Sequence, residues 1–374
     1  MAARRAALVR LRMHGSDTET VHSAVAPWWH RLRWVQTSAS DAIRAEQALL
    51  ACGRQGAVPG AKITTFDTVL QGNDRTIHAI RCEIAERDDN TVPLVLVPGY
   101  GAGAAFFWRS LAPLAQGTGR CVYAVDWLGA GNSGRPRFTA QTHDSAVAFF
   151  LDALEAWRVA NDIPRMALCG HSLGGYLATQ YALKHPECVT HLVLVSPAGM
   201  TARSGPPPKS MLYRAIAAAW ESGFTPHGLV RFLGPFAAGR TKEYASRRFH
   251  EGDALSPSEE EAFANYLLHT LSGNASAELA LQHLLAPGAW AKYPLLEVLP
   301  TLHVPHLAFI YGATDWMDPR AGAAALEAIK QRQPHCDIKV ADLSVLPRAG
   351  HYPFINAPDA FHEAMFAALR RDTS

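Results

Sequence analysis

The chain has 374 residues, of which 48% are hydrophobic and 18% charged, and its formal net charge is +2. This is ample material for a core, and the length suits one large domain with an insertion, or two domains. The small net charge excludes a broad positive field, and no Lys/Arg stripe with interleaved aromatics is present, so we expect no nucleic-acid partner.

Residues 1–15 are basic, rich in Ala and Leu, and free of acidic residues. This composition is typical of a mitochondrial transit peptide, and the alternative is a basic tail that touches anionic membrane surfaces or nothing. We therefore expect a mitochondrial protein, or else a cytoplasmic one associated with membranes or lipid droplets. The arginines of this stretch are Arg4, Arg5, Arg10 and Arg12.

Residues 26–34 set Trp28, Trp29 and Trp34 beside basic residues, a mixture suited to the interfacial layer of a bilayer. Alternatively, these tryptophans pack onto the main domain. No apolar run approaches the roughly 18 residues of a membrane-spanning helix, so we expect a soluble or peripherally bound chain. Residues 1–60 are accordingly assigned to an N-terminal targeting or membrane-facing segment, with the membrane surface as a partner.

Downstream, short apolar runs alternate with amphipathic stretches, of which 144–160 and 173–184 have helical spacing. Nearly continuous apolar strands separated by helices predict an α/β fold with a mostly parallel central sheet covered on both faces. The candidate strands are 76–84, 92–98, 121–127, 165–170, 189–197, 306–312 and 336–346.

Residues 199–302 break this alternation, with a Pro-rich opening and helical patterns but no convincing strand. We predict a helical cap inserted into a core of residues 61–198 and 303–374, above the carboxyl edge of the sheet, where open α/β sheets place their sites. Five aromatic residues of the insertion could line an acyl groove or form the core of the cap itself: Trp220, Phe224, Phe232, Phe236 and Trp290.

Cysteine spacing offers no metal site. The six cysteines are scattered without CxxC or zinc-finger spacing, which favours reduced thiols in an intracellular compartment. We expect neither a metal nor a cofactor. The cysteines are Cys52, Cys82, Cys121, Cys169, Cys188 and Cys336.

Residues 170–174, "GHSLG", form a G-x-S-x-G pattern between a strand and a helix. In this context the small flanking residues allow a sharp turn that lifts the serine hydroxyl above the sheet. The following helix aims its N-terminal amides at the same point. Ser172 is therefore the predicted nucleophile, and the alternative is a glycine-bounded turn with an incidental serine.

A serine nucleophile requires a base and an orienting acid, in the chain order Ser, Asp, His. His351 follows the last candidate strand in a glycine-containing loop and is the predicted base. After the strand before it, Asp315 is favoured as the acid over Asp318, which could instead cap the helix that begins near Pro319.

The oxyanion of an acyl transfer needs two amide donors. We predict the backbone N–H of Leu173, directly after the nucleophile, and that of Tyr100, in the glycine-rich loop "PGYGAGAAFFW". The same glycines could suggest a phosphate-binding loop, but the Lys-Ser/Thr of a P-loop is absent.

Several stretches together resemble the α/β-hydrolase lipases of the ABHD4/ABHD5 type: "GYGAGAAFFWRSLAPLA", "VYAVDWLGAGNSGRPRF", "GHSLGGYLATQYALKHPE", "LVLVSPAGM", "IYGATDWMD" and "AGHYPFINAPDAF". The "GYGAG" and "YGxxDWMD" forms are most similar to fungal and plant members. The resemblance implies Ser172 as nucleophile, Asp315 as acid and His351 as base. It also implies glycerophospholipid substrates, including mitochondrial cardiolipin in a yeast relative.

Two positions depart from this pattern. Members with an H-x4-D motif are linked to lysophosphatidate acyltransferase activity, but here His185 is followed by Thr190 in place of the aspartate, which puts that activity in doubt. Pro98 stands where many relatives have histidine. We expect a serine-dependent phospholipid acyl hydrolase of the phospholipase A or lysophospholipase type. The alternatives are a non-catalytic lipid-binding co-activator of another lipase, and a small-ester esterase or peptidase on the same fold.

Overall fold

The computed structural model describes residues 11–12, 37–54, 58–72, 74–85, 91–203, 205, 208, 210–249, 255–332 and 336–369. Arg4, Arg5 and Arg10 and the three tryptophans Trp28, Trp29 and Trp34 lie outside the described residues, so the predictions made for them stay predictions. Within the described ranges, no helix is long and apolar enough to cross a membrane. The same ranges hold no group of His, Cys, Asp or Glu that could bind a metal ion.

A nine-stranded sheet forms the centre of the molecule, in the order β1-β2-β3-β5-β4-β6-β7-β10-β11. The pairs among β1, β2, β3 and β5 are antiparallel, and all pairs from β5 to β11 are parallel. The strands are β1 (Leu11–Arg12), β2 (Lys62–Val69), β3 (Thr76–Glu83), β4 (Leu94–Val97), β5 (Val122–Val125), β6 (Met166–His171), β7 (Val189–Val195), β10 (His306–Gly312) and β11 (Val340–Leu346).

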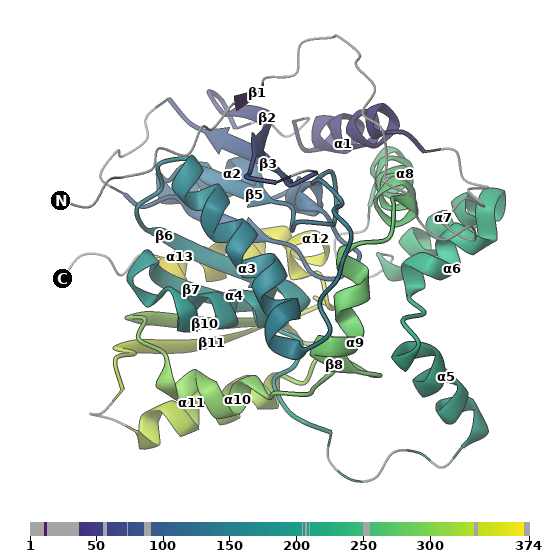
Figure 1. The fold of residues 1–374 in the computed structure, drawn as a ribbon. Helices are drawn as coiled ribbons and strands as arrows, with labels where there is room; N and C mark the ends of the chain where they lie inside the picture. The colour runs from purple at the N-terminus through teal and green to yellow at the C-terminus, as the bar shows by residue number, and fades with distance from the viewer. Residues whose placement is uncertain are drawn as a thin grey trace, which may run out of the picture.

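Helices cover both faces of this sheet and bury two separate apolar clusters against it. On one face lie α3 (His143–Ala160), α4 (Leu173–Lys184) and α11 (Pro319–Gln331). On the other lie α2 (Leu111–Thr118), α12 (Pro353–Asn356) and α13 (Pro358–Leu369). Figure 1 shows α3 and α4 in front of the strands and α13 behind them. The predicted α/β class, with its mostly parallel sheet, is confirmed.

Helix α1 (Ala39–Arg54) belongs to the packed fold, although the sequence grouped it with the N-terminal segment 1–60. Its Glu46 is fully buried and accepts hydrogen bonds from His78 Nε2 and from Asn132 Nδ2, both at 2.9 Å. Burial alone would lower the pKa of His78, but its carboxylate partners raise it well above the ordinary value. The buried ion pair between Glu46 and His78 therefore connects α1 to β3. Separating the two would leave a buried charge without a partner, which is strongly destabilising.

The insertion between β7 and β10 is mostly helical, as predicted, and Figure 1 shows α5 to α8 beyond one end of the sheet. A short antiparallel pair, β8 (Leu285–Ala286) with β9 (Trp290–Ala291), was not predicted. The helices are α5 (Met211–Glu221), α6 (Pro226–Leu233), α7 (Ala237–Arg248), α8 (Pro257–Ser272), α9 (Leu281–Leu284) and α10 (Leu295–Val298). The 3₁₀ helices are η2 (Ala104–Phe107), η3 (Pro186–Cys188), η4 (Gly234–Phe236), η5 (Ala277–Ala280) and η6 (Leu299–Thr301).

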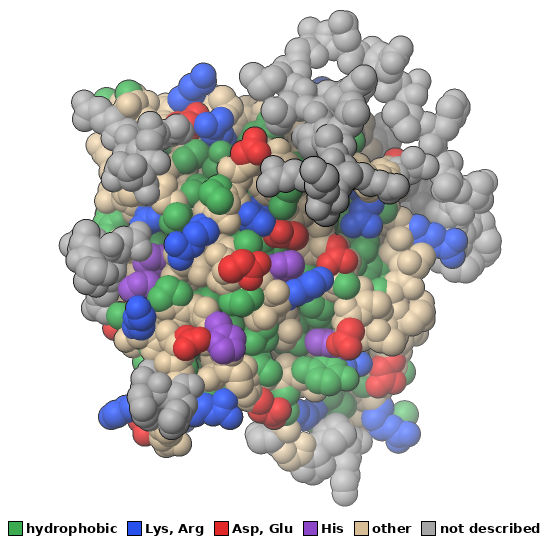
Figure 2. Space-filling view, turned by 60° about the vertical axis from the view of Figure 1, so that its left-hand side comes forward, with side chains coloured by type: hydrophobic (Ala, Val, Ile, Leu, Met, Phe, Trp, Pro, Cys, Tyr) green, Lys and Arg blue, Asp and Glu red, His purple; other side chains and the backbone are tan. Residues whose placement is uncertain are grey.

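The surface carries no dominant charge on the face drawn in Figure 2. Acidic and basic side chains are interspersed there among hydrophobic ones. This mixed pattern agrees with the small net charge of +2.

Three histidines are buried inside the fold as neutral groups. Burial lowers the pKa of His171 to about 3 and those of His227 and His362 to about 4. An unfolded chain binds protons on histidine near pH 6.5, whereas these folded imidazoles do so only near pH 4 or below. The stability that they contribute is therefore complete above pH 6.5 and is lost as the pH falls toward the folded pKa values.

We expect His362→Gln to weaken the acid dependence of folding. His362 lies on α13, and its Nε2 is 3.0 Å from Ser110 Oγ, a contact that glutamine can replace. Between pH 6 and 4.5 the unfolding free energy of the variant should fall less steeply, by up to about 1.4 kcal/mol per pH unit. Urea unfolding at several pH values measures this, with the exposed His303→Gln as control. Parallel slopes for His362→Gln and the unmodified chain would contradict the neutral burial of His362.

Candidate active site

Ser172 lies at the sharp turn between β6 and α4, with φ +53° and ψ −119°. This is a strained conformation for a residue with a Cβ, and it persists only where neighbours hold it. Here the Ser172 amide donates to Val195 O (2.9 Å), and the Ala198 amide donates to Ser172 O (3.0 Å). The end of β7 thus fixes the turn that presents the serine hydroxyl.

The glycines of "GHSLG" are required by close backbone contacts. A Cβ on Gly170 would lie 2.4 Å from Gly174 O, and a Cβ on Gly174 would lie 2.4 Å from Pro98 O. A side chain at position 170 would push α4 away from β6, and one at position 174 would push the turn away from the end of β4. The Gly-x-Ser-x-Gly spacing therefore follows from packing at this crossing.

The structure brings Ser172, His351 and Asp315 together in one hydrogen-bonded row. Ser172 Oγ lies 3.0 Å from His351 Nε2, and His351 Nδ1 lies 2.9 Å from Asp315 Oδ1. A carboxylate only accepts, so Nδ1 carries the proton and Nε2 is left to accept from the serine hydroxyl. The His351 and Asp315 side chains are 5% and 0% exposed, which shields this pair from solvent. The row has the geometry of a nucleophile, base and orienting acid.

Asp315 and Asp318 have different environments. The Met317 amide also donates to Asp315 Oδ1 (2.9 Å). Burial alone would raise the pKa of Asp315, but its hydrogen bond to His351 and the neighbouring charge lower it. Asp318 instead caps α11 at the surface, where it accepts from the Arg320 amide at 2.9 Å. Of the two carboxylates, only Asp315 contacts the imidazole.

His171 is a site residue that the sequence analysis missed. Its ring is buried, and its Nε2 donates to the backbone carbonyl of His351 at 2.8 Å. The two imidazole rings lie 4.8 Å apart. Because burial lowers the pKa of His171 to about 3, it stays neutral and adds no positive charge beside the base. The available signal was a polar residue inside an otherwise buried strand end.

The predicted oxyanion donors lie on two segments beside the nucleophile. A Cβ on Gly99 would lie 2.8 Å from Ser172 Cβ, so the loop after β4 passes directly over the serine. Tyr100 and Leu173 line the same cavity as Ser172. Within the described part of the chain, neither of their amides donates to another backbone group, so both remain available to a developing oxyanion.

Tyr100 also connects this loop to the cap, a contact that the sequence did not predict. Its hydroxyl lies 2.9 Å from His227 Nδ1 on α6, and the two rings pack edge to face at 4.9 Å. Burial lowers the pKa of His227 to about 4, so the ring stays neutral and its Nδ1 accepts a hydrogen bond from the Tyr100 hydroxyl. A buried ion pair between Arg231 and Glu278 (2.7 Å) supports the same corner. We call this Tyr100–His227 contact the clasp.

A cavity of about 630 Å³ opens above Ser172 between the sheet and the cap. Of the five cap aromatics singled out in the sequence, Trp220 lines it, and Trp290 does not. Phe224, Phe232 and Phe236 neither line the cavity nor form the core of the cap, so both expectations for them are wrong: they are 53%, 78% and 80% exposed. The walls combine aromatic residues from outside the predicted set, such as Phe106 and Trp316, with aliphatic ones, among them Val230, Leu267, Leu271, Leu281 and Leu285.

Residues 92–358 match the family described as alpha/beta hydrolase fold. The chain therefore belongs to the α/β-hydrolase fold family. A solved hydrolase of this architecture, 2-hydroxy-6-oxo-6-phenylhexa-2,4-dienoate hydrolase from Rhodococcus sp. strain RHA1, aligns with a TM-score of 0.59 at 18% identity, covering 83% of this chain and 99% of that one. At this identity the likeness concerns the fold alone.

Relatives found by sequence similarity identify a smaller group within this family. The chain is 37% identical to a rice (Oryza sativa subsp. japonica) protein named probable 1-acylglycerol-3-phosphate O-acyltransferase, covering 92% of this chain and 84% of that one. It is 33% identical to human (Homo sapiens) 1-acylglycerol-3-phosphate O-acyltransferase ABHD5, covering 73% and 76%. A mouse (Mus musculus) (lyso)-N-acylphosphatidylethanolamine lipase is 32% identical, covering 74% and 78%. The predicted resemblance to the ABHD4/ABHD5 group is confirmed.

The stretch that corresponds to the H-x4-D motif lies away from Ser172. His185 follows the far end of α4, and twelve helical residues separate it from the serine by about 18 Å. Thr190 is buried at the start of β7, where its hydroxyl donates to Met166 O at 3.3 Å. Neither residue lines the cavity above the serine.

Proposed function

We propose that this protein is a serine-dependent acyl hydrolase of glycerophospholipids. The observation that carries the proposal is the 3.0 Å contact between Ser172 Oγ and His351 Nε2, at the floor of a largely apolar cavity of about 630 Å³. Apolar walls with a few convergent polar groups suit an acyl chain ending in an ester. The lipid-acting relatives favour the same class of substrate.

The reaction follows from the hydrogen bonds of the site. His351 Nε2 accepts the Ser172 proton as Oγ attacks the ester carbonyl, and Asp315 holds the imidazole and balances its charge. The oxyanion accepts from the amides of Tyr100 and Leu173. His351 then passes its proton to the departing lysolipid oxygen. Water, deprotonated by His351, finally releases the fatty acid from the serine.

Acyl transfer is the second candidate, because the rice and human relatives are named acyltransferases. Both reactions share the same acyl-serine. In transfer, the hydroxyl of a lysophospholipid replaces water as the group that attacks it. What distinguishes them is therefore the acceptor, and the competition depends on how far the cavity excludes water from the acyl-serine.

One experiment tests both candidates. Full-length protein is mixed with phospholipid vesicles and labelled lysophosphatidate, and released fatty acid and labelled phosphatidate are measured together. We expect fatty acid release that Ser172→Ala abolishes, and covalent labelling by a fluorophosphonate that the same variant loses. Labelled phosphatidate in place of fatty acid would establish transfer. Equal rates with and without the serine hydroxyl would rule out the serine mechanism. Absence of both fatty acid release and labelling would indicate a lipid-binding co-activator, and a preference for short acyl esters would indicate a small-ester esterase.

The membrane surface is the proposed location of the substrate. Phe232 and Phe236 expose most of their side chains on the cap, and Phe224 and Met211 are exposed on neighbouring segments. Clusters of exposed large apolar side chains mark surfaces that bind partners or membranes. Phe232 and Phe236 directly precede α7, whose arginines would meet anionic headgroups. We infer that the cap faces the bilayer.

The double variant Phe232→Ser and Phe236→Ser should therefore bind vesicles at least ten-fold more weakly, since burying one such side chain contributes about 1.5–3 kcal/mol. Sedimentation with anionic vesicles measures the binding. Val159→Ser, which removes an apolar side chain that is 56% exposed on α3, is the control. Both changes are at the surface, so thermal midpoints should not move. Full vesicle binding by the double variant would contradict the assigned orientation.

Cardiolipin as substrate and a mitochondrial location remain predictions from the sequence. They are supported by the basic composition of residues 1–15 and by the ABHD4/ABHD5 resemblance. Lipid profiling of cells that lack the protein tests both, because accumulation of cardiolipin species would identify substrate and compartment together.

A further inference from the structure

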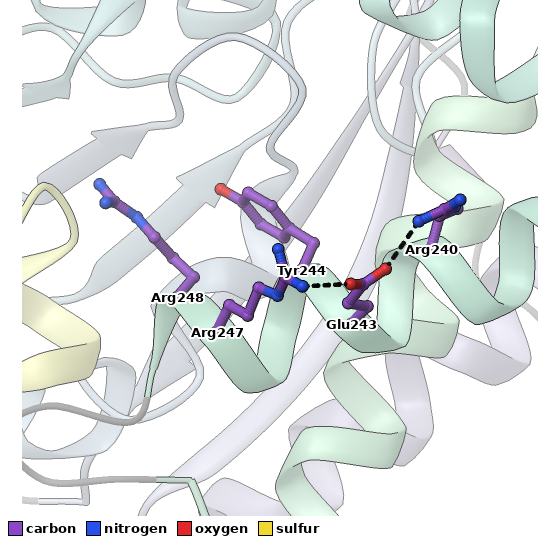
Figure 3. Close-up of a pocket in the computed structure, with 5 residues that line it drawn as sticks. All are labelled: Arg240, Glu243, Tyr244, Arg247 and Arg248. Carbon is purple, nitrogen blue, oxygen red and sulfur yellow. Dashed lines mark hydrogen bonds and ion pairs between the residues drawn. The ribbon is translucent and has the colours of Figure 1, made fainter.

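Helix α7 contributes cationic side chains to the cavity above the nucleophile. Arg240 and Arg248 line that cavity together with Ser172 and His351. The two arginines also border an adjoining hollow of about 310 Å³, shown in Figure 3. The α7 face thus connects the apolar acyl space to a more polar recess.

The charge of this face is mostly uncompensated. The side chains of α7 that border the hollow include three arginines and one carboxylate, a net charge of +2. The carboxylate, Glu243, is shared, since it lies 2.9 Å from Arg240 Nη1 and 2.6 Å from Arg247 Nη2 (Figure 3). Among the described residues that line the main cavity there is no Asp or Glu.

Arg248 lies near the catalytic imidazole without an acidic partner among the described residues. Its guanidinium is 5.6 Å from the centre of the Tyr352 ring. Tyr352 directly follows His351, and their rings are 5.3 Å apart. The tyrosine ring therefore packs against both the cation and the base, which places the Arg248 guanidinium near the end of the cavity that holds the nucleophile.

We propose that Arg240 and Arg248 bind the phosphate group of the glycerophospholipid whose acyl chain fills the cavity. The assignment deepens the proposed function and rests on it for the identity of the lipid. A guanidinium matches phosphate oxygens through paired N–H donors. In a glycerophospholipid the phosphate is only a few bonds from the acyl ester. The site therefore selects phosphate-bearing lipids over neutral acylglycerols with the same chain.

Binding to the full-length Ser172→Ala protein tests this without turnover. The probes are oleoyl lysophosphatidate and monooleoylglycerol as monomers, and inorganic phosphate alone, each followed by titration calorimetry. We expect the phosphate-bearing lipid to bind about 100-fold more tightly than the neutral one. Arg240→Met and Arg248→Met keep the aliphatic stem, and each should reduce this preference about ten-fold. The phosphate-bearing lipid should bind more weakly to both variants, whereas the affinity for monooleoylglycerol should not change. Lys242→Met, on the exposed side of the same helix, should leave it unchanged.

Each of the other possible results contradicts a specific part of the proposal. If both arginine variants keep the full preference, the phosphate is bound elsewhere. If inorganic phosphate binds as tightly as the lipid, the site serves free phosphate. If the variants lose vesicle binding but keep the preference among monomeric lipids, the arginines belong to the membrane surface. Preference in the Ser172→Ala protein together with absent hydrolysis by the unmodified chain would sink the proposed function and leave the phosphate site standing.

Discussion

Asp315→Asn is expected to lower kcat on an ester substrate by about 10⁴-fold, while Asp318→Asn stays within about two-fold. An asparagine amide at 315 can donate to His351 Nδ1, which would move the ring proton to Nε2. The imidazole could then no longer accept the Ser172 proton across the 3.0 Å contact. Asp318 contacts only α11 and Arg320, so its loss removes a helix cap and no part of the chemistry.

Initial rates on a soluble ester, with thermal unfolding as a check on folding, measure this difference. The two variants make a matched pair, because both replace a carboxylate of the same loop with its amide. Equal losses at both positions would show that the loop acts through its overall charge. Full loss of activity in Asp318→Asn alone would mean that Asp318, and not Asp315, is the orienting acid.

Gly174→Ala should remove activity by more than about 100-fold and destabilise the fold by about 3 kcal/mol. The added methyl would lie 2.4 Å from Pro98 O and 2.7 Å from Val97 O, both backbone atoms at the end of β4. Relief requires the turn and the loop after β4 to separate. That movement displaces Ser172 from His351 and parts the two amides expected to hold the oxyanion.

Gly239→Ala is the matched control, since a Cβ there meets no atom within 4 Å. It lies inside α7, where alanine should stabilise by about 0.5–1 kcal/mol. Urea unfolding and ester hydrolysis on both variants test the contrast. A Gly174→Ala protein that keeps its rate and its midpoint would mean that the crossing of β4 and the turn tolerates a side chain.

Most of the parallel part of the sheet was predictable because strands β4, β5, β6, β7 and β10 are buried on both faces and are apolar nearly throughout. Strand β2 was missed, because only Phe66 and Thr68 of its eight residues are buried and threonines break the apolar pattern. Helix α1 was misassigned for a related reason. Its Ala45, Leu49 and Leu50 pack in the core, and its buried Glu46 meets His78, a pairing across 32 residues that leaves no local pattern.

The site likewise contains residues that the sequence could predict and residues that it could not. Ser172, Asp315 and His351 were predictable because each follows a strand in a chain order set by the fold. The clasp joins residues 127 apart, and its partner His227 is one histidine among 17, so no spacing could single it out. The roles expected for Phe224, Phe232 and Phe236 were wrong, because the sequence of a short segment does not show which of its side chains face the core and which face solvent.

The clasp constrains how a lipid reaches the serine. The amide expected to receive the oxyanion belongs to the residue whose hydroxyl is tied to α6. Any outward movement of α6 would either pull that amide along or break the Tyr100–His227 hydrogen bond. The geometry of the oxyanion site therefore depends on the position of the cap above it.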